Sequence, residues 1–73
     1  MFKVDMLATG KRMQARCKDA GYSSKDLSIL LNVDLSLPHY WFTGKAMPSW
    51  NIMVNLAVLL ECKIDDLLVI VDE

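Results

Sequence analysis

The stretch Ser23–Val33, SSKDLSILLNV, combines a helix start, a helical apolar pattern and a helix stop. Ser23 or Ser24 can cap the helix, because a serine oxygen accepts a free backbone N–H of the first turn. Asp26 follows two or three residues later, where a carboxylate favours a helix start. The buried face of this helix is predicted to consist of Leu27, Leu30 and Leu31.

A sharp turn is predicted directly after this helix, at Asn32. Asparagine tolerates the left-handed backbone conformation better than most residues other than glycine, so it can end one helix and redirect the chain. Asp34 can cap the next helix, which is predicted near Leu35 to Phe42 with Pro38 inside it. The sequence thus predicts two short helices joined by a short turn.

Three further helices are predicted around this pair. The first runs roughly from Asp5 to Ala20, before Gly21 stops it. A loop from Thr43 to Pro48 leads to a fourth helix, capped by Ser49 and ending near Leu60. A fifth starts near Ile64 and carries Leu67, Leu68 and Ile70 or Val71. The predicted inward positions are Met6, Gly10, Met13 and Cys17 in the first helix and Ile52 or Met53, Leu56, Ala57 and Leu60 in the fourth.

Length and composition limit the possibilities further. The chain has 73 residues, 53% of them hydrophobic and 23% charged, which predicts one folded domain over residues 1–73 and argues against disorder. The run Leu67–Val71 is too short to span a bilayer, and residues 1–5 lack the apolar stretch of a secretory signal. We therefore expect a cytoplasmic protein without a membrane partner.

Few residues are available for a metal or for catalysis. Cys17 and Cys62 lie far apart, form no CxxC unit and are accompanied by a single histidine, His39, so no zinc site is expected. Both cysteines fit an apolar pattern and are interpreted as reduced core residues, with a disulfide as the alternative. No phosphate loop or nucleophile motif is present, and we expect neither a cofactor nor an enzyme activity.

The net charge of −1 hides an uneven distribution. Residues 1–45 contain seven lysines and arginines against four aspartates, whereas residues 46–73 contain one lysine against five acidic residues. The two parts thus carry net charges of +3 and −4. Such an uneven charge distribution suits a protein that places one face against phosphate groups. Small domains nevertheless often have modest charge asymmetry by chance.

A short helix, a three-residue turn and a second short helix form the helix-turn-helix arrangement. Over about residues 9 to 68 the sequence resembles the phage repressor and Cro type (XRE-like) of helix-turn-helix domain. The resemblance rests on SSKDLSILLNV, on WFTGKAMPSW (residues 41–50) and on NLAVLLECKIDDLL (residues 55–68). Leu27 matches the buried leucine, Ser28 the small residue between the helices, and Asn32 the turn position usually held by glycine.

The resemblance implies an all-α, compact, five-helix fold like that of lambda repressor, with the motif in helices two and three. It implies a sequence-specific, repressor-like transcriptional regulator of bacterial or phage origin. The third helix would enter the major groove of duplex DNA. The residues implied to face base edges are Leu35, Ser36, His39 and Tyr40. The candidate phosphate contacts are Ser24, Lys25 and Lys45.

The family commonly binds paired half-sites as a dimer. Val69, Ile70 and Val71 exceed what a small core needs and are the preferred candidates for an interface between two copies, with Trp50 as a further candidate. Alternatively, each of these apolar residues packs in the core of the monomer. Each candidate lysine can likewise be a solvated surface charge.

Some residues depart from the family pattern and support a second hypothesis. Pro38 replaces an anchoring isoleucine or valine, Phe42 replaces a glutamate, and the third helix contains no arginine for reading guanine. The fold could therefore serve as a protein-interaction module, or as an antitoxin, with weak or lost DNA binding. Aromatic residues 40–42 would then form a patch for a protein partner.

Overall fold

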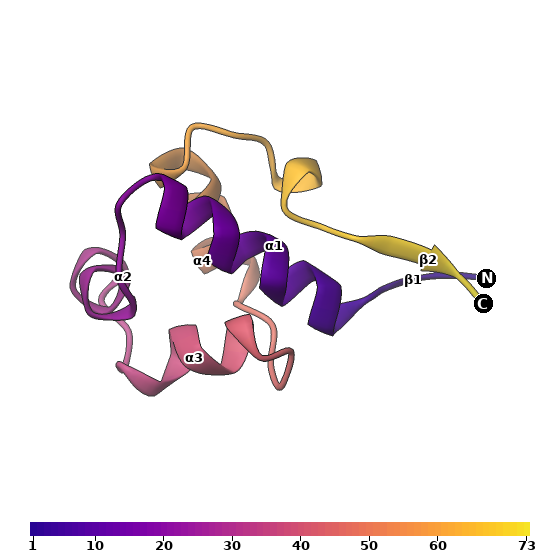
Figure 1. Ribbon diagram of the computed structural model, residues 1–73, viewed down its shortest axis with the longest axis horizontal. Helices are drawn as coiled ribbons and strands as arrows, with labels where there is room; N and C mark the ends of the chain where they lie inside the picture. The colour runs from indigo at the N-terminus through magenta and orange to yellow at the C-terminus, as the bar shows by residue number, and fades with distance from the viewer.

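Four α-helices and a small two-stranded sheet make up the computed structural model, which describes residues 1–73 (Figure 1). Figure 1 shows α1 crossing the body, with α2 and α3 on one side and the paired chain ends projecting as a ribbon. In chain order the elements are β1 (Phe2–Val4), α1 (Met6–Asp19), α2 (Ser24–Leu31), α3 (Ser36–Phe42), α4 (Trp50–Leu59), the 3-10 turn η1 (Ile64–Asp66) and β2 (Ile70–Asp72).

The first two helices begin and end close to where the sequence predicts. The Asp5 carboxylate accepts the Ala8 N–H at 3.0 Å and caps α1. At α2, the Ser23 hydroxyl accepts the Asp26 N–H at 3.1 Å, while the Asp26 carboxylate accepts the Ser23 N–H at 2.9 Å. This reciprocal capping box satisfies two N–H groups that the helix itself leaves free. Ser23, one of the two predicted caps, is therefore the cap that is used.

Two residues predicted to be buried in these helices are exposed. Leu30 is 53% exposed and Met6 37% exposed, whereas Leu27 and Met13 are fully buried. Successive residues of a helix are rotated by about 100° around its axis, so only a narrow stripe of a short helix meets the core. Leu27 and Leu31, spaced by four, fill that stripe in α2, and Leu30 lies beside it.

The third helix differs from expectation at its start. Leu35, not Asp34, holds the cap position and makes no side-chain cap, but the Asp34 carboxylate still accepts the N–H of the first helical residue, Ser36, at 2.9 Å. Pro38 falls in the first turn, where the missing N–H removes no helical hydrogen bond. Its side chain is among the most completely buried of the chain. Pro38 therefore anchors α3 to the core in place of a larger aliphatic residue.

The fourth helix agrees with the sequence prediction. The Ser49 hydroxyl accepts the Ile52 N–H at 3.3 Å, and the chain leaves the helix at Leu60. The buried positions of α4 are Met53, Leu56 and Ala57, whereas Ile52 and Leu60 are half-buried.

The predicted fifth helix is wrong, and with it the five-helix, all-α description. Only the short turn η1 forms, after which β2 pairs antiparallel with β1, Lys3 opposite Val71. Ile70 and Val71 are β-branched and fit a strand. The preceding residue, Val69, is held on α1: the Thr9 hydroxyl accepts its N–H at 2.9 Å, and its carbonyl accepts the Asp5 N–H at 2.8 Å.

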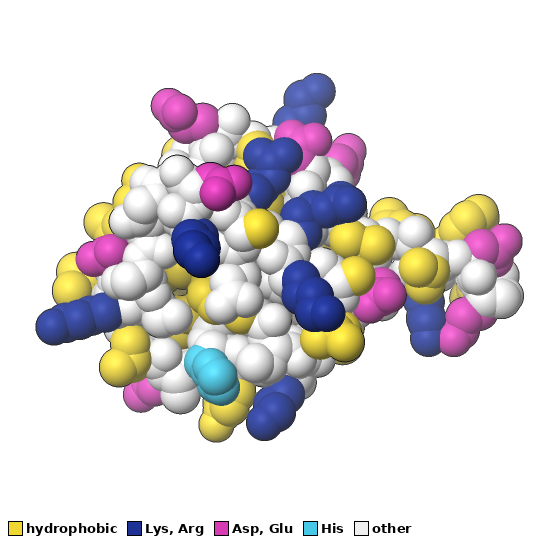
Figure 2. Space-filling model, viewed as in Figure 1, with side chains coloured by type: hydrophobic (Ala, Val, Ile, Leu, Met, Phe, Trp, Pro, Cys, Tyr) yellow, Lys and Arg dark blue, Asp and Glu magenta, His cyan; other side chains and the backbone are white.

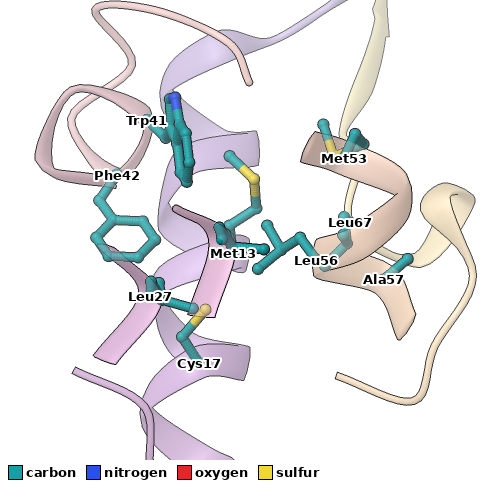
Figure 3. Close-up of a cluster of buried hydrophobic side chains, with 10 residues drawn as sticks. Met13, Cys17, Leu27, Trp41, Phe42, Met53, Leu56, Ala57 and Leu67 are labelled. Atoms are coloured by element: carbon teal, nitrogen blue, oxygen red, sulfur yellow. The ribbon is translucent and has the colours of Figure 1, made fainter. Parts of the chain in front are cut away.

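The core gathers side chains from every helix around Met13 (Figure 3). Figure 3 shows Met13 of α1 between Trp41 and Phe42 on one side and Leu56 and Leu67 on the other. Cys17 and Cys62 are free thiols, as interpreted from the sequence; Cys17 is buried and Cys62 half-buried. Burial, with a smaller effect from Cys62, raises the pKa of the Cys17 thiol to about 11. No helix is long and apolar enough to cross a bilayer.

Gly10 allows α1 to lie directly on the end of α3. A Cβ at this position would come within 2.8 Å of the Phe42 carbonyl oxygen and closer still to that of Trp41. Both neighbours are backbone atoms, which cannot rotate away. The absence of a side chain at residue 10 therefore fixes how closely α3 approaches α1.

We predict that Gly10→Ala destabilises the protein, although alanine is the better helix former. Helix propensity favours alanine by about 1 kcal/mol. Overpacking costs about 1–3 kcal/mol, and contact with two fixed carbonyl groups puts this site above the lower end of that range, so the cost exceeds the gain. Urea unfolding measures the net change. The control, Gln14→Ala at an exposed position of the same helix, is expected to change the free energy of unfolding by less than about 0.5 kcal/mol. An equally stable Gly10→Ala variant would contradict the proposed packing.

Candidate nucleic-acid interface

The turn between α2 and α3 is built around Asn32 and Ser28. Asn32 adopts the left-handed conformation, with φ 54° and ψ 52°, as its position predicts. The Val33 N–H donates to the Ser28 carbonyl at 3.1 Å, and the Ser28 hydroxyl donates to the Val33 carbonyl at 2.7 Å. Ser28 therefore holds the turn together through its carbonyl and its hydroxyl. The sequence reasoning did not predict the hydroxyl hydrogen bond.

The four residues proposed to face bases lie together at the exposed side of α3. Leu35 is 55% and Tyr40 40% exposed, and Ser36 and His39 are exposed as well. The other side of the helix, Pro38, Trp41 and Phe42, packs into the core. α3 therefore turns a mixed surface of two polar side chains, an aliphatic one and a phenol toward solvent.

Burial of Trp41 and Phe42 removes the predicted aromatic patch. Trp41 is only 2% and Phe42 8% exposed, so Tyr40 alone of residues 40–42 is accessible. The proposal that these three side chains bind a protein partner is wrong for this structure. Their spacing explains the difference, because a helix cannot present three consecutive side chains to the same side.

The candidate phosphate-binding lysines lie before and after α3 in the chain and form no ion pair. Lys25 lies in the first turn of α2 and Lys45 in the loop after α3, and both are exposed. The ion pairs of the structure join the Met1 amino group to Asp72 and Lys3 to Glu73, so neither of these lysines is paired. Ser24, the third candidate, is half-buried at the start of α2.

A groove beside these residues contains polar groups, of which the sequence reasoning had named only Ser24 as a DNA contact. It lies between α1 and the start of α2 and is lined in part by Gln14, Lys18, Ser23 and Ser24. Figure 2 shows Lys and Arg side chains spread over the face crossed by α1. α1 carries four cations, Lys11, Arg12, Arg16 and Lys18. The clustering of these four cations in one predicted helix is the sequence feature that indicates this positively charged face.

A negative group lies directly before α3. Asp34 is exposed and precedes α3, and its Oδ1 accepts the Ser36 N–H at 2.9 Å and the Ser36 hydroxyl at 2.7 Å. The backbone N–H and, second, the hydroxyl of Ser36 lower the pKa of the Asp34 carboxyl below its ordinary value. The carboxylate is therefore ionised at neutral pH and partly compensated by an amide at the helix start.

The residues proposed for an interface between two copies differ in exposure. Trp50 is 70% and Ile70 58% exposed, whereas Val69 and Val71 are half-buried. Ile70 and Val71 lie in β2 rather than on a helix.

The fold has a counterpart among solved structures. The restriction-modification controller protein C.AhdI from Aeromonas hydrophila superposes with a TM-score of 0.77, over 86% of this chain and 96% of that one. The two sequences are 24% identical. The chain has the helix-turn-helix fold that its sequence predicts. No protein-family signature and no curated protein sequence matches the chain.

Within this helix-turn-helix domain, α2 and α3 are the two helices of the motif, and α1 and α4 support them. One helix-turn-helix motif carries the exposed side of α3 and Lys25 of α2, and Lys45 lies in the loop directly after it. The domain can present positive charge to the phosphates of a polyanion. It can also present hydrogen-bonding groups to the chemical groups that lie between those phosphates.

Proposed function

We propose that this helix-turn-helix domain binds duplex DNA and regulates transcription, by occupying an operator as a repressor does. One observation carries the proposal: α3 exposes Leu35, Ser36, His39 and Tyr40 between two unpaired lysines, Lys25 and Lys45. A recognition helix must reach base edges while flanking cations hold phosphates. We place the protein in the bacterial cytoplasm, where its DNA would be.

Base reading by this helix would be modest. Ser36 and His39 can exchange hydrogen bonds with base edges, Tyr40 can reach a base or a phosphate, and Leu35 can contact a thymine methyl. Without arginine, α3 cannot make the bidentate contact to guanine that is the commonest specific contact. Phosphate contacts would then supply much of the affinity, which makes binding sensitive to salt.

We predict that Lys25→Ala and Lys45→Ala each weaken binding and reduce the slope of log affinity against log salt by about one unit. Each variant loses one phosphate contact and therefore the release of about one counterion. Fluorescence anisotropy with a random-sequence duplex, at several salt concentrations, measures the slopes.

Lys63→Ala is the matched control. Lys63 is an exposed lysine before η1, and Figure 1 shows η1 across the body from α3. Its removal changes the net charge equally and should leave the slope unchanged. Equal slopes in all three variants would contradict this docking face, and no binding of the unaltered protein at low salt would contradict DNA binding itself.

We propose further that the domain acts as a homodimer through α4. Trp50, Val54 and Val58 follow one another at four-residue spacing and are 70%, 41% and 71% exposed. α4 contains no charged residue, so two copies can meet without burying a charge. A dimer would present two recognition helices to paired half-sites. The tail is the weaker candidate, since of Val69, Ile70 and Val71 only Ile70 is well exposed.

We predict that Trp50→Lys gives a monomer, because the dimer would have to bury the new charge. Sedimentation equilibrium over a range of concentrations gives the mass. Ile29→Lys is the matched control, since Ile29 is also 70% exposed but lies on α2, and this variant should remain dimeric. Ile70→Lys tests the tail in the same way. A monomeric unaltered protein, or a dimeric Trp50→Lys variant, would refute the α4 interface.

A further inference from the structure

Ser28 connects the two helices of the motif through three hydrogen bonds. Its carbonyl accepts the N–H of Asn32, which ends α2, and the N–H of Val33 at 3.1 Å. Its hydroxyl donates to the Val33 carbonyl at 2.7 Å. Val33 lies between the two helices, and both of its backbone polar groups are therefore bonded to one residue of α2.

The hydroxyl bond lies where α3 has few other supports. The later part of α3 is fixed by packing, because its apolar side is buried in the core. Leu35 and Ser36, at the start of the helix, are exposed, and Leu35 makes no side-chain cap. The hydrogen bonds from Ser36 to Asp34 are local to that start and do not reach α2. Val33 is thus the last residue before α3 that is hydrogen-bonded to α2.

We propose that Ser28 is a positioning residue for base recognition. Its hydroxyl fixes the start of α3 relative to α2 and thereby sets where Leu35 and Ser36 meet the bases. This inference rests on the proposed function, because it requires α2 to contact phosphate and α3 to enter the major groove. It goes beyond that function by assigning sequence discrimination to a side chain whose hydroxyl is bonded within the protein.

Contacts to phosphates and contacts to bases differ in how much movement they tolerate. Lysine carries its charge on a long flexible stem, so Lys25 and Lys45 can follow a small shift of a helix. A hydrogen bond to a base edge weakens outside a narrow range of distance and angle, and the side chain of Ser36 is short. A small displacement of the start of α3 relative to α2 therefore weakens base contacts more than phosphate contacts.

The two kinds of contact must also agree in register. Phosphate contacts fix the position of a protein on the duplex, and base contacts then read the sequence at that position. Lys25 of α2 and Ser36 of α3 belong to the two kinds, and Ser28 lies three residues after Lys25 in the same helix. The Ser28 hydroxyl therefore carries the register that α2 sets on the phosphates to the start of α3.

Thr43 provides a matched control at the other end of α3. Its hydroxyl also donates to a backbone carbonyl, that of His39, at 2.9 Å. This bond stays between α3 and its own C-terminal cap. Ser28→Ala removes a hydroxyl and keeps a small side chain between the helices, and Thr43→Val removes a hydroxyl and keeps the shape of the side chain. Only the first substitution breaks a bond that joins α2 to the residues before α3.

The experiment first selects a preferred site from random duplexes with the unaltered protein. Fluorescence anisotropy then gives the affinities of the unaltered protein, Ser28→Ala and Thr43→Val for this site and for random-sequence duplex. We expect Ser28→Ala to lower the ratio of the two affinities by roughly fivefold, the effect of one hydrogen bond. Its affinity for random duplex and its slope of log affinity against log salt should stay unchanged, because the phosphate contacts are kept. Thr43→Val should change neither quantity.

The outcomes separate this inference from the function beneath it. An unchanged affinity ratio in Ser28→Ala would overturn the inference and leave DNA binding in place. Equal losses of affinity for both duplexes would also overturn it, because the hydroxyl would then support the fold as a whole. An equal fall of the ratio in Thr43→Val would do the same, since any hydroxyl beside α3 would then suffice. Failure of the unaltered protein to bind any duplex would overturn the proposed function and this inference together.

Discussion

The contact between α1 and the end of α3 determines what α3 can present to solvent. At Gly10 the two backbones meet without an intervening side chain, so α3 is pressed onto α1 through the carbonyls of Trp41 and Phe42. That approach directs the apolar side of α3, including Pro38, into the core. The opposite side must then be exposed, and it carries Ser36 and His39. The surface that we propose for recognition is in this sense a consequence of core packing.

Charge and hydrogen bonding give this surface an unusual balance. The cations of α1, together with Lys25 and Lys45, favour a polyanion, whereas the helix that would read it contains no lysine or arginine. In the proposed function, the lysines would supply salt-dependent affinity and the exposed groups of α3 would supply discrimination between bases.

Local signals in the sequence predicted most of the fold. Ser23 and Ser49 cap helices as expected, and Asn32 takes the left-handed turn, because capping and backbone preference depend on residues a few positions apart. The tail could not be predicted in this way. Whether Ile70 continues a helix or joins a strand depends on β1, at the other end of the chain, and on the Thr9 hydroxyl that holds Val69.

The candidate site was predicted as a set of positions but not as a set of interactions. The family resemblance placed Leu35, Ser36, His39 and Tyr40 on one side of the third helix and its start, and all four are exposed. The sequence reasoning wrongly grouped Trp41 and Phe42 with Tyr40, since composition suggested a patch that helix geometry divides. The bond from Ser36 to Asp34 depends on side-chain conformation, which no periodicity specifies.

The measurement that tests the account most directly is a titration of the isotope-labelled protein with a random-sequence duplex, followed residue by residue through amide NMR signals. The account predicts that the shifted signals cluster at the start of α2, along residues 35–40 and at Lys45, and that they diminish as salt is added. Unchanged spectra, or shifts confined to the exposed side of α4 around Trp50 and Val58, would contradict it.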